Sequence, residues 1–550
     1  MDRREFVKGA LAAGTLAVGG TLAACTPSAA SNSAASSAAA STSSAASSSA
    51  SSKPTGRWSW SIPPDPIPDD KISETYDCDI CVVGAGVAGI STSLYAAEKG
   101  QKVVVLQKDP HISVNGQSMG AWNHPAGDAA GIVWDNAATM QHYADISDGK
   151  NNLKLFRNYL IHSGEALDYI NQYAPVGADK PKPTIATLAG AYGYQHLSCS
   201  YLINGDFLTR YTGWRMFNEA LAEKAQEFGA TYLYSTPAEQ LVTDSSGAVV
   251  GVIGKDEDGK YVKVNAKNVI LCTGDLTSSE EMKEAYFPML VGRPTLHTSK
   301  CNTGDGQKMG MWVGASFDNA PAGVMLHYDP SPLSFPAPPM SAAPWLHVNI
   351  FGERFCNEYV GYQASATAVS AQPEFRAYQV IDSHFMENLD YYKNGFRRGT
   401  LAVWEQCVNE GSILKADTLE ELAKLAGFPV DTFLATVKRY NELVDKGVDE
   451  DFGSAVIQYN GIKDPPFYTI QRMPAVLVSG LGLTCNEFGQ VMSKEFKPIK
   501  GLYAAGNTQG SFYGYDYPVE GFGGTGIGRC ITLGIMDVMH ILGTHGQKIE

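Results

Sequence analysis

Apolar segments and glycines alternate near residue 80 in the order expected of a nucleotide-binding unit. Residues 78–83 (CDICVV) form an apolar run that predicts a buried strand, and residues 84–89 (GAGVAG) follow at once. Residues 90–99 continue with a helical pattern that ends at Gly100, and residues 102–106 (KVVVL) predict a second strand. This order of strand, glycine turn, helix and strand, within about 30 residues, is typical of dinucleotide binding.

The three glycines of the turn have separate steric roles. Gly84 makes the tight turn, Gly86 lets the backbone approach a pyrophosphate, and Gly89 lets the helix pack on the strand. The N-terminus of the helix then faces the phosphates. An acidic residue usually ends the second strand and accepts the ribose hydroxyls; Gln107 stands there instead, with Asp109 as an alternative. An amide can also bond two hydroxyls, so the pattern is compatible with non-covalently bound FAD.

Two short motifs suggest other chemistry but lack the sequence context for it. Residues 116–120 (GQSMG) spell the nucleophile elbow of serine hydrolases, which needs a strand directly before it and a helix directly after it. Ser118 instead follows a polar, turn-like segment, and no helical pattern follows. Cys78 and Cys81 form C-x-x-C within the first predicted strand, which indicates core cysteines. No clustered cysteines indicate an iron–sulfur centre, and we expect no metal site.

The N-terminus has the pattern of an export signal. Arg3 and Arg4 precede an apolar stretch, so residues 1–24 are predicted to be a twin-arginine lipoprotein signal. Cys25 follows Leu-Ala-Ala as in a lipobox, and its lipidation would anchor the exported protein to the bacterial cytoplasmic membrane. An ordinary cleaved signal with a chance cysteine is the alternative. Residues 25–73, which begin with a Ser/Ala-rich stretch, predict a flexible tether.

Composition sets the scale of the fold and excludes one class of partner. The 550 residues are enough for two domains with large cores, and 44% of them are hydrophobic. The formal net charge of -15 argues against nucleic-acid binding.

Five further motifs narrow the class of nucleotide-binding protein. Together with the glycine turn, and in this order, they resemble the fumarate reductase/succinate dehydrogenase flavoprotein superfamily, which includes urocanate reductases and 3-ketosteroid dehydrogenases. The motifs are residues 268–274 (NVILCTG), 303–306 (TGDG), 352–358 (GERFCNE), 501–507 (GLYAAGN) and 523–528 (GGTGIG). The resemblance covers residues 75–545.

The resemblance implies an α/β architecture, with a Rossmann-type FAD-binding domain and an inserted α+β clamp domain. The FAD-binding domain would comprise residues 74–320 and 470–545, and the clamp residues 321–469. The active site would lie where the clamp meets the flavin. The residues implied to contact FAD, beyond the glycine turn and Gln107, are Ser118, Thr273, Gly274, Asp305, Gly506, Asn507, Thr525 and Ile527. No haem or flavin-carrier segment is present, so we expect a separate electron partner, such as the quinone pool or a cytochrome.

The sequence departs from the fumarate reductases at their charged substrate positions. These positions fall on Tyr517, Val478, Phe385 and Tyr362. A dianionic substrate would be desolvated there without a charged partner, at a cost of several kcal/mol. We therefore do not expect a fumarate reductase.

Residues 517–521 (YPVEG) instead resemble the Tyr-Pro-x-x-Gly motif of ketosteroid dehydrogenases. The resemblance implies that the Tyr517 hydroxyl and the Gly521 amide bind a ketone oxygen, and that Tyr362 exchanges a proton. The alternative is that each tyrosine only packs. Tyr513, Tyr515 and His327 are further candidates with a less specific pattern.

The predicted function is that of an FAD-dependent oxidoreductase acting on a CH–CH or C=C bond of a small, carbonyl-activated substrate. A free tyrosine has a pKa of about 10 and is ready to act as an acid at neutral pH, which favours reduction. Two alternatives stay open: an enoate reductase of the urocanate or fumarate type, and a flavin-binding electron-transfer protein without substrate chemistry.

Overall fold

A computed structural model describes most of the chain beyond residue 56. The residues that it describes are 57–116, 118–173, 182–189, 195–202, 210–293, 295–296, 300–318, 323–327, 343–386, 400–518 and 522–550. The predicted signal, most of the predicted tether, and Gly521 lie outside these residues. Residues 57–71 are hydrogen-bonded to the main body, where the Trp60 carbonyl accepts from Trp312 Nε1 at 2.9 Å and the Asp65 carbonyl from Gln240 Nε2 at 2.7 Å.

An eight-stranded sheet forms the centre of the nucleotide-binding part. Val83, the last residue of β1, is in register with Leu106 of β2 and Leu271 of β9, so three parallel strands end at one edge. In spatial order the strands are β16 (Gln490–Met492), β17 (Pro498–Ala504), β9 (Tyr261–Leu271), β1 (Ile72–Val83), β2 (Val103–Leu106) and β6 (Thr231–Leu233); β7 (Ala238–Thr243) and β8 (Val249–Lys255) form an antiparallel pair attached to β9.

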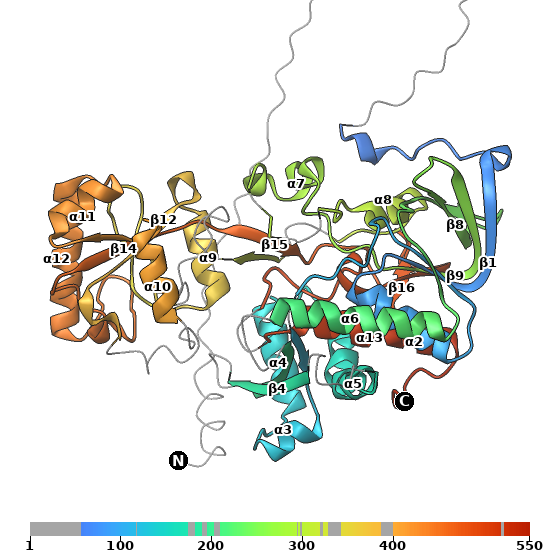
Figure 1. The fold of residues 1–550 in the computed structure, drawn as a ribbon, viewed down its shortest axis with the longest axis horizontal. Helices are drawn as coiled ribbons and strands as arrows, with labels where there is room; N and C mark the ends of the chain where they lie inside the picture. The colour runs from blue at the N-terminus through green and yellow to red at the C-terminus, as the bar shows by residue number, and fades with distance from the viewer. Residues whose placement is uncertain are drawn as a thin grey trace, which may run out of the picture. The chain divides into compact units, whose positions relative to one another are not determined.

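Both faces of this sheet are buried, because alternate residues of β1 enter different cores. Ile80 and Val82 pack in a cluster with the helices of one face, whereas Cys81 and Val83 pack in a second cluster. On the first face, α2 (Val87–Glu98) lies beside α6 (Arg210–Glu227) and α13 (Thr525–Ile541), and α13 also contacts α5 (Leu153–Asn171) (Figure 1). Met309 of α8 (Asp305–Trp312) belongs to the second cluster.

A small sheet follows the first βαβ unit along the chain. Its order is β3 (Ser118–Ala121), β5 (Gln195–Leu202) and β4 (Lys182–Ala189). Ser118 begins a strand here, opposite Ser200, and the next helix is α3 (Pro125–Ala129). The strand-turn-helix geometry of a nucleophile elbow is therefore absent at Ser118.

A four-stranded sheet with its own core forms the inserted α+β part. The antiparallel order is β11 (Leu346–Val348), β12 (Ala377–Ile381), β14 (Phe467–Arg472) and β13 (Leu414–Ala416). Val380, Phe433 and Tyr440 are buried together in this core. The predicted fold class, a Rossmann-type domain with an inserted α+β part, is confirmed; the exact domain boundaries stay a prediction.

The remaining elements connect these parts. They are α4 (Asn136–Ile146), α7 (Glu280–Tyr286), α9 (Tyr362–Ser370), α10 (Thr400–Asn409), α11 (Leu419–Ala426), α12 (Val430–Lys446), the antiparallel pair β10 (Val324–His327) and β15 (Ala475–Ser479), and 3-10 turns that include η6 (Ser383–Met386), η8 (Ile457–Tyr459) and η9 (Gly506–Thr508). In the described part of the chain, no helix is long and apolar enough to cross a membrane.

Candidate cofactor and active site

The glycine turn has the geometry that the sequence predicts. Gly84 has φ +104°, and a Cβ there would lie 2.4 Å from the Cys272 carbonyl oxygen. A Cβ at Gly89 would lie 1.8 Å from the Gly84 carbonyl oxygen, so no larger residue fits beneath the turn. Helix α2 begins at Val87, earlier than its apolar pattern suggests, because extended Gly86 is its N-cap. The free N–H groups of this helix end therefore open towards the turn.

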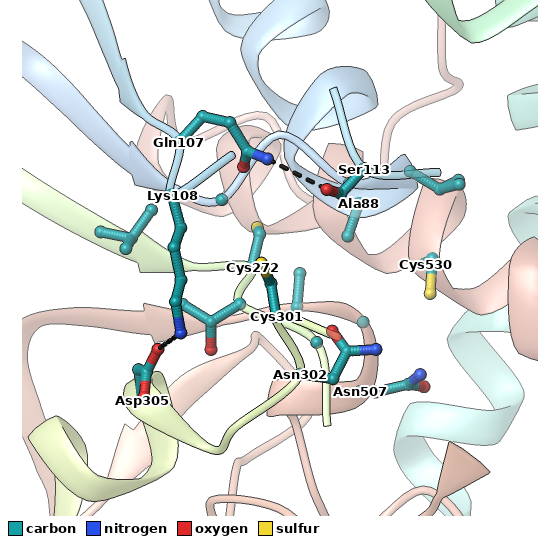
Figure 2. A pocket seen from close by; sticks show the side chains of 18 of the residues that line it. Ala88, Gln107, Lys108, Ser113, Cys272, Cys301, Asn302, Asp305, Asn507 and Cys530 are labelled. Carbon is teal, nitrogen blue, oxygen red and sulfur yellow. Dashed lines mark hydrogen bonds and ion pairs between the residues drawn. The ribbon is translucent and has the colours of Figure 1, made fainter. Parts of the chain in front are cut away.

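A cleft opens at the edge of the sheet where β1, β2 and β9 end (Figure 2). The predicted cofactor residues that line it are Gly84, Gly86, Gln107, Thr273, Gly274, Asp305, Gly506, Asn507 and Ile527. Gly89, Ser118 and Thr525 do not line it: Gly89 packs behind the turn, Ser118 begins β3, and Thr525 is buried at the start of α13.

The Gln107 amide contacts the protein rather than the open cleft. Its Oε1 accepts from the Ala85 amide at 2.8 Å, and its Nε2 donates to the His111 carbonyl at 3.0 Å and to Ser113 Oγ at 3.2 Å. The side chain thus ties the glycine turn to residues 111–113. A ribose contact from Gln107 stays a prediction.

Lys108 and Cys301, which the sequence did not single out, join two sides of the cleft. Lys108 Nζ lies 2.9 Å from both Asp305 Oδ2 and Thr303 Oγ1 (Figure 2), and Cys301 Sγ donates to Asp109 Oδ1 at 2.6 Å. The position of Lys108, next to Gln107 at the end of the second strand, is the only signal that could have indicated it from the sequence.

At the other end of the cleft, Asn507 is held by a residue that the sequence did not single out. Asn507 Oδ1 accepts from Arg529 Nη2 at 2.8 Å, and Arg529 is fully buried on α13. A charged residue within an apolar helix, one position after the GGTGIG motif, is the signal that could have identified it.

Tyr517 lies buried beside the N-terminal turn of α13. Its ring centroid is 4.3 Å from that of Tyr513, and a Cβ at Gly526 would lie 2.3 Å from the Tyr517 hydroxyl. Burial raises the pKa of Tyr517 well above 10, so the phenol stays protonated. Tyr517 does not line this cleft. The structure therefore provides a neutral donor near the cleft, but not a base.

The structure describes the side chains of only some of the other residues predicted to contact the substrate. Tyr362 begins α9, but its side chain, like Gly521, lies outside the described residues. Tyr515 is exposed, with Lys150 Nζ 4.6 Å from its ring centroid, and His327 ends β10 in a half-buried position. The structure does not bring these residues together with Tyr517 in a described contact.

Two positions at which the resemblance predicts the charged substrate residues of fumarate reductases are occupied by apolar core residues. Val478 is buried on β15 opposite Met325, and Phe385 stacks on Trp404 with ring centroids 4.3 Å apart. Neither side chain could bind a carboxylate.

The sequence matches the FAD binding domain family over residues 79–523. The chain belongs to this family. It is therefore an FAD-binding flavoprotein, and the glycine cradle with its facing helix end fits the pyrophosphate of that cofactor.

Several oxidoreductases are similar along most of the chain. Vinyl phenol reductase from Lactiplantibacillus plantarum is 27% identical over 86% of this chain and 98% of its own length. A 3-oxosteroid 1-dehydrogenase from Mycolicibacterium smegmatis is 26% identical over 85% of this chain and 97% of its own length. NADH:fumarate oxidoreductase from Klebsiella pneumoniae is 26% identical over 81% of this chain, which spans 46% of that longer protein.

Solved structures show the same fold. The open conformation of a flavocytochrome c3 fumarate reductase superposes with a TM-score of 0.67 at 23% identity, and the match covers 88% of this chain and 82% of the other. A 3-ketosteroid-Δ4-(5α)-dehydrogenase from Rhodococcus jostii gives 0.66 at 20% identity, covering 86% and 99%.

Proposed function

We propose that this protein is an FAD-dependent oxidoreductase that acts on a CH–CH or C=C bond conjugated to an oxygen-bearing group, and that it works as a reductase. The observation that carries the chemistry is the neutral, buried Tyr517 next to the N-terminal turn of α13, which can donate a hydrogen bond to a substrate oxygen. The direction rests on Tyr362, the residue proposed to exchange the proton at carbon, because a free tyrosine has a pKa of about 10 and is a proton donor at neutral pH.

We propose separate roles for the residues that hold FAD and for those that contact the substrate. FAD, when bound, supplies the hydride chemistry. Gly84, Gly86 and the N-terminus of α2 hold its pyrophosphate. Tyr517 and the Gly521 amide stabilise negative charge on the substrate oxygen, and Tyr362 delivers a proton to the neighbouring carbon.

A neutral substrate suits this site better than a dicarboxylate. The names of the relatives refer to a vinyl phenol, 3-oxosteroids and fumarate, and each of these compounds has a C=C bond or a CH–CH pair near an oxygen-bearing group. Val478 and Phe385 provide no charge for a carboxylate. We therefore propose a vinyl phenol or an unsaturated ketone as the substrate class.

A substrate screen tests this proposal. The FAD-loaded protein would be assayed anaerobically with reduced methyl viologen and a vinyl phenol, a cyclic enone, a 3-oxosteroid, urocanate or fumarate. We expect a neutral conjugated substrate to turn over fastest. Fumarate or urocanate as the fastest substrate would replace the proposal with an enoate reductase, and FAD reduction without turnover of any compound would favour an electron-transfer protein.

We further propose that the FAD is bound non-covalently. The cleft residues form a cradle through backbone and short side chains, and the turn chemistry requires no covalent link. Acid precipitation should release a yellow chromophore of FAD size into the supernatant; a chromophore that stays with the protein pellet would contradict this.

We also propose export by the twin-arginine route and lipid anchoring through Cys25, which would keep the enzyme near quinones or cytochromes as electron partners. The support is the sequence pattern at Arg3, Arg4 and Cys25. Changing both arginines to lysine should retain the protein in the cytoplasm, and Cys25→Ala should release it from the membrane fraction. Unaltered location of both variants would contradict the proposal.

A further inference from the structure

Arg529 is a buried cation behind Asn507 and Cys530, which line the cofactor cleft; Arg529 itself does not line it. Its side chain is 0% exposed, on the second turn of α13. Nη1 donates to the Gln509 carbonyl at 3.2 Å and Nη2 to Asn507 Oδ1 at 2.8 Å. The guanidinium carbon lies 5.0 Å from the ring centroid of Phe512 and 4.7 Å from that of Tyr513. All of these partners are neutral.

No negative charge compensates Arg529 within the described residues. No carboxylate oxygen there lies within 4.0 Å of its nitrogens, and Nε is buried without a hydrogen-bond partner. The two buried carboxyl groups of this region face elsewhere: Asp318 accepts from the Ser511 amide at 2.7 Å, and Asp537 packs on Gly489. Because a guanidinium does not deprotonate in proteins, a buried one without a counter-charge costs several kcal/mol.

The position of Arg529 relative to the cleft indicates which ligand supplies the missing charge. The glycine turn holds the pyrophosphate, and the end of β2, at Gln107 and Lys108, is the ribose end of such sites. Asn507 and Cys530, the residues that adjoin Arg529, line the cleft away from Lys108 (Figure 2). The flavin ring system therefore belongs at the Asn507 end.

We propose that Arg529 sets the reduction potential of the bound FAD, as a positioning and electrostatic residue. Its Nη2 holds the oxygen of the Asn507 amide, so that the Nδ2 donor of Asn507 faces the cleft. Its uncompensated charge stabilises the negative charge that the flavin ring takes up on reduction, and so raises the potential. The proposal rests on FAD binding and is independent of the substrate.

Three variants measured without substrate test it. In the FAD-loaded protein, Arg529→Gln should lower the preference for the reduced flavin at least tenfold. For a two-electron couple this corresponds to a reduction potential lower by about 30 mV. Arg529→Lys, which keeps the charge, should stay near the wild-type potential. Arg472→Gln is the matched control, because Arg472 is equally buried but lies on β14, and it should leave the potential unchanged.

Asn507→Asp keeps the proposal falsifiable if Arg529→Gln fails to fold or to bind FAD. The new carboxylate would pair with Arg529 at the distance of the present amide, so we expect higher thermal stability. We also expect the preference for the reduced flavin to fall at least tenfold, which corresponds to a reduction potential lower by about 30 mV. An unchanged potential in Asn507→Asp, or in FAD-loaded Arg529→Gln, would overturn the proposal.

Discussion

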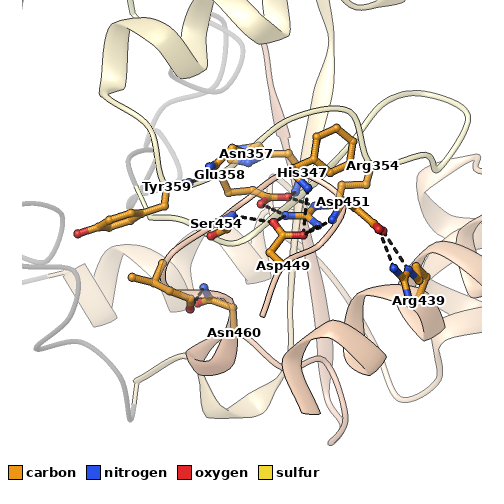
Figure 3. Close-up of polar contacts among 12 residues, drawn as sticks. His347, Arg354, Asn357, Glu358, Tyr359, Arg439, Asp449, Asp451, Ser454 and Asn460 are labelled. Carbon is orange, nitrogen blue, oxygen red and sulfur yellow. Dashed lines mark hydrogen bonds and ion pairs between the residues drawn. The ribbon is translucent and has the colours of Figure 1, made fainter. Parts of the chain in front are cut away.

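Two buried arginines of this protein differ in whether a negative charge compensates them. Arg354, in the inserted α+β part, donates to Glu358 at 2.8 and 2.6 Å and to Asp449 at 2.9 and 2.7 Å (Figure 3). Arg529, at the cofactor cleft, contacts only neutral groups among the described residues. One cation thus has two carboxylates, and the other has none.

The difference separates a structural charge from a functional one. Arg354 joins the segment before α9 to the loop after α12, and Glu358 also accepts from the His347 amide at 3.3 Å. A buried charge that is fully paired holds segments together. A buried charge left uncompensated beside a ligand cleft is pre-organised for charge on the ligand.

The largest effect is expected where a paired cation is removed. Arg354→Met would leave Glu358 and Asp449 buried without their partner, and breaking such a cluster costs about 3–5 kcal/mol. Thermal unfolding should show a clear loss of stability. The control is Arg439→Met in the same part of the fold, where the ion pair with Asp451 is exposed and is worth less than about 1 kcal/mol. Equal losses in both variants would show that Arg354 is not a structural centre.

Tyr517→Phe extends the comparison to a neutral group beside Arg529. Removing one donor to a developing oxyanion should lower turnover on the order of a hundredfold, about 3 kcal/mol, with FAD content unchanged. Because burial raises the pKa of Tyr517 well above 10, its protonated form persists, and wild-type turnover should not lose this donor as pH rises to 10. Tyr261→Phe, on a half-buried residue of β9, is the control. Undiminished turnover of an FAD-loaded Tyr517→Phe variant would show that Tyr517 only packs.

Short-range steric rules explain why the nucleotide-binding unit could be predicted from the sequence. The role of Gly89 depends on the Gly84 carbonyl within one βαβ unit, and the structure confirms the order of strand, turn, helix and strand. Gly84 adds a close approach to the Cys272 carbonyl at the end of β9, which the local pattern does not include. The apolar runs of β1 and β2 are buried on both faces, as continuous hydrophobic strands of parallel sheets are.

Contacts between distant segments could not be predicted in the same way. Arg354 and Asp449 are 95 residues apart, and the bond from Arg529 to Asn507 depends on how the chain returns to α13. Gln107 marks the expected position in the sequence, yet its amide turns towards Ala85 and His111. Position in a motif fixes where a residue lies, whereas its partners are fixed by tertiary packing.

Asp449→Asn should give a smaller loss of stability than Arg354→Met, because Arg354 keeps Glu358. Weakening charge-assisted hydrogen bonds costs about 2 kcal/mol. Burial raises the pKa of Asp449, but hydrogen bonds from Arg354 outweigh it and lower the pKa from 3.8 to about 2. This stabilisation is complete above about pH 4 and is lost as the pH falls to about 2. Wild type and variant should therefore differ in melting temperature at neutral pH and converge over this window; a constant difference would contradict the assignment.

The smallest effect is expected at the rim of the cofactor cleft, where Lys108 pairs with Asp305 at 2.9 Å and both side chains are partly exposed, at 37% and 30%. An ion pair of this exposure contributes about 0–1 kcal/mol and is screened by salt. Because it joins two sides of the cleft, we expect Lys108→Met to release FAD only a few-fold faster, and high salt to speed release from the wild type but not from the variant. FAD fluorescence after dilution measures the rate. Lys154→Met, which removes a similar surface pair with Glu487, should leave the rate unchanged. A loss of FAD binding far beyond a few-fold would show that Lys108 supplies a charge that the cofactor needs.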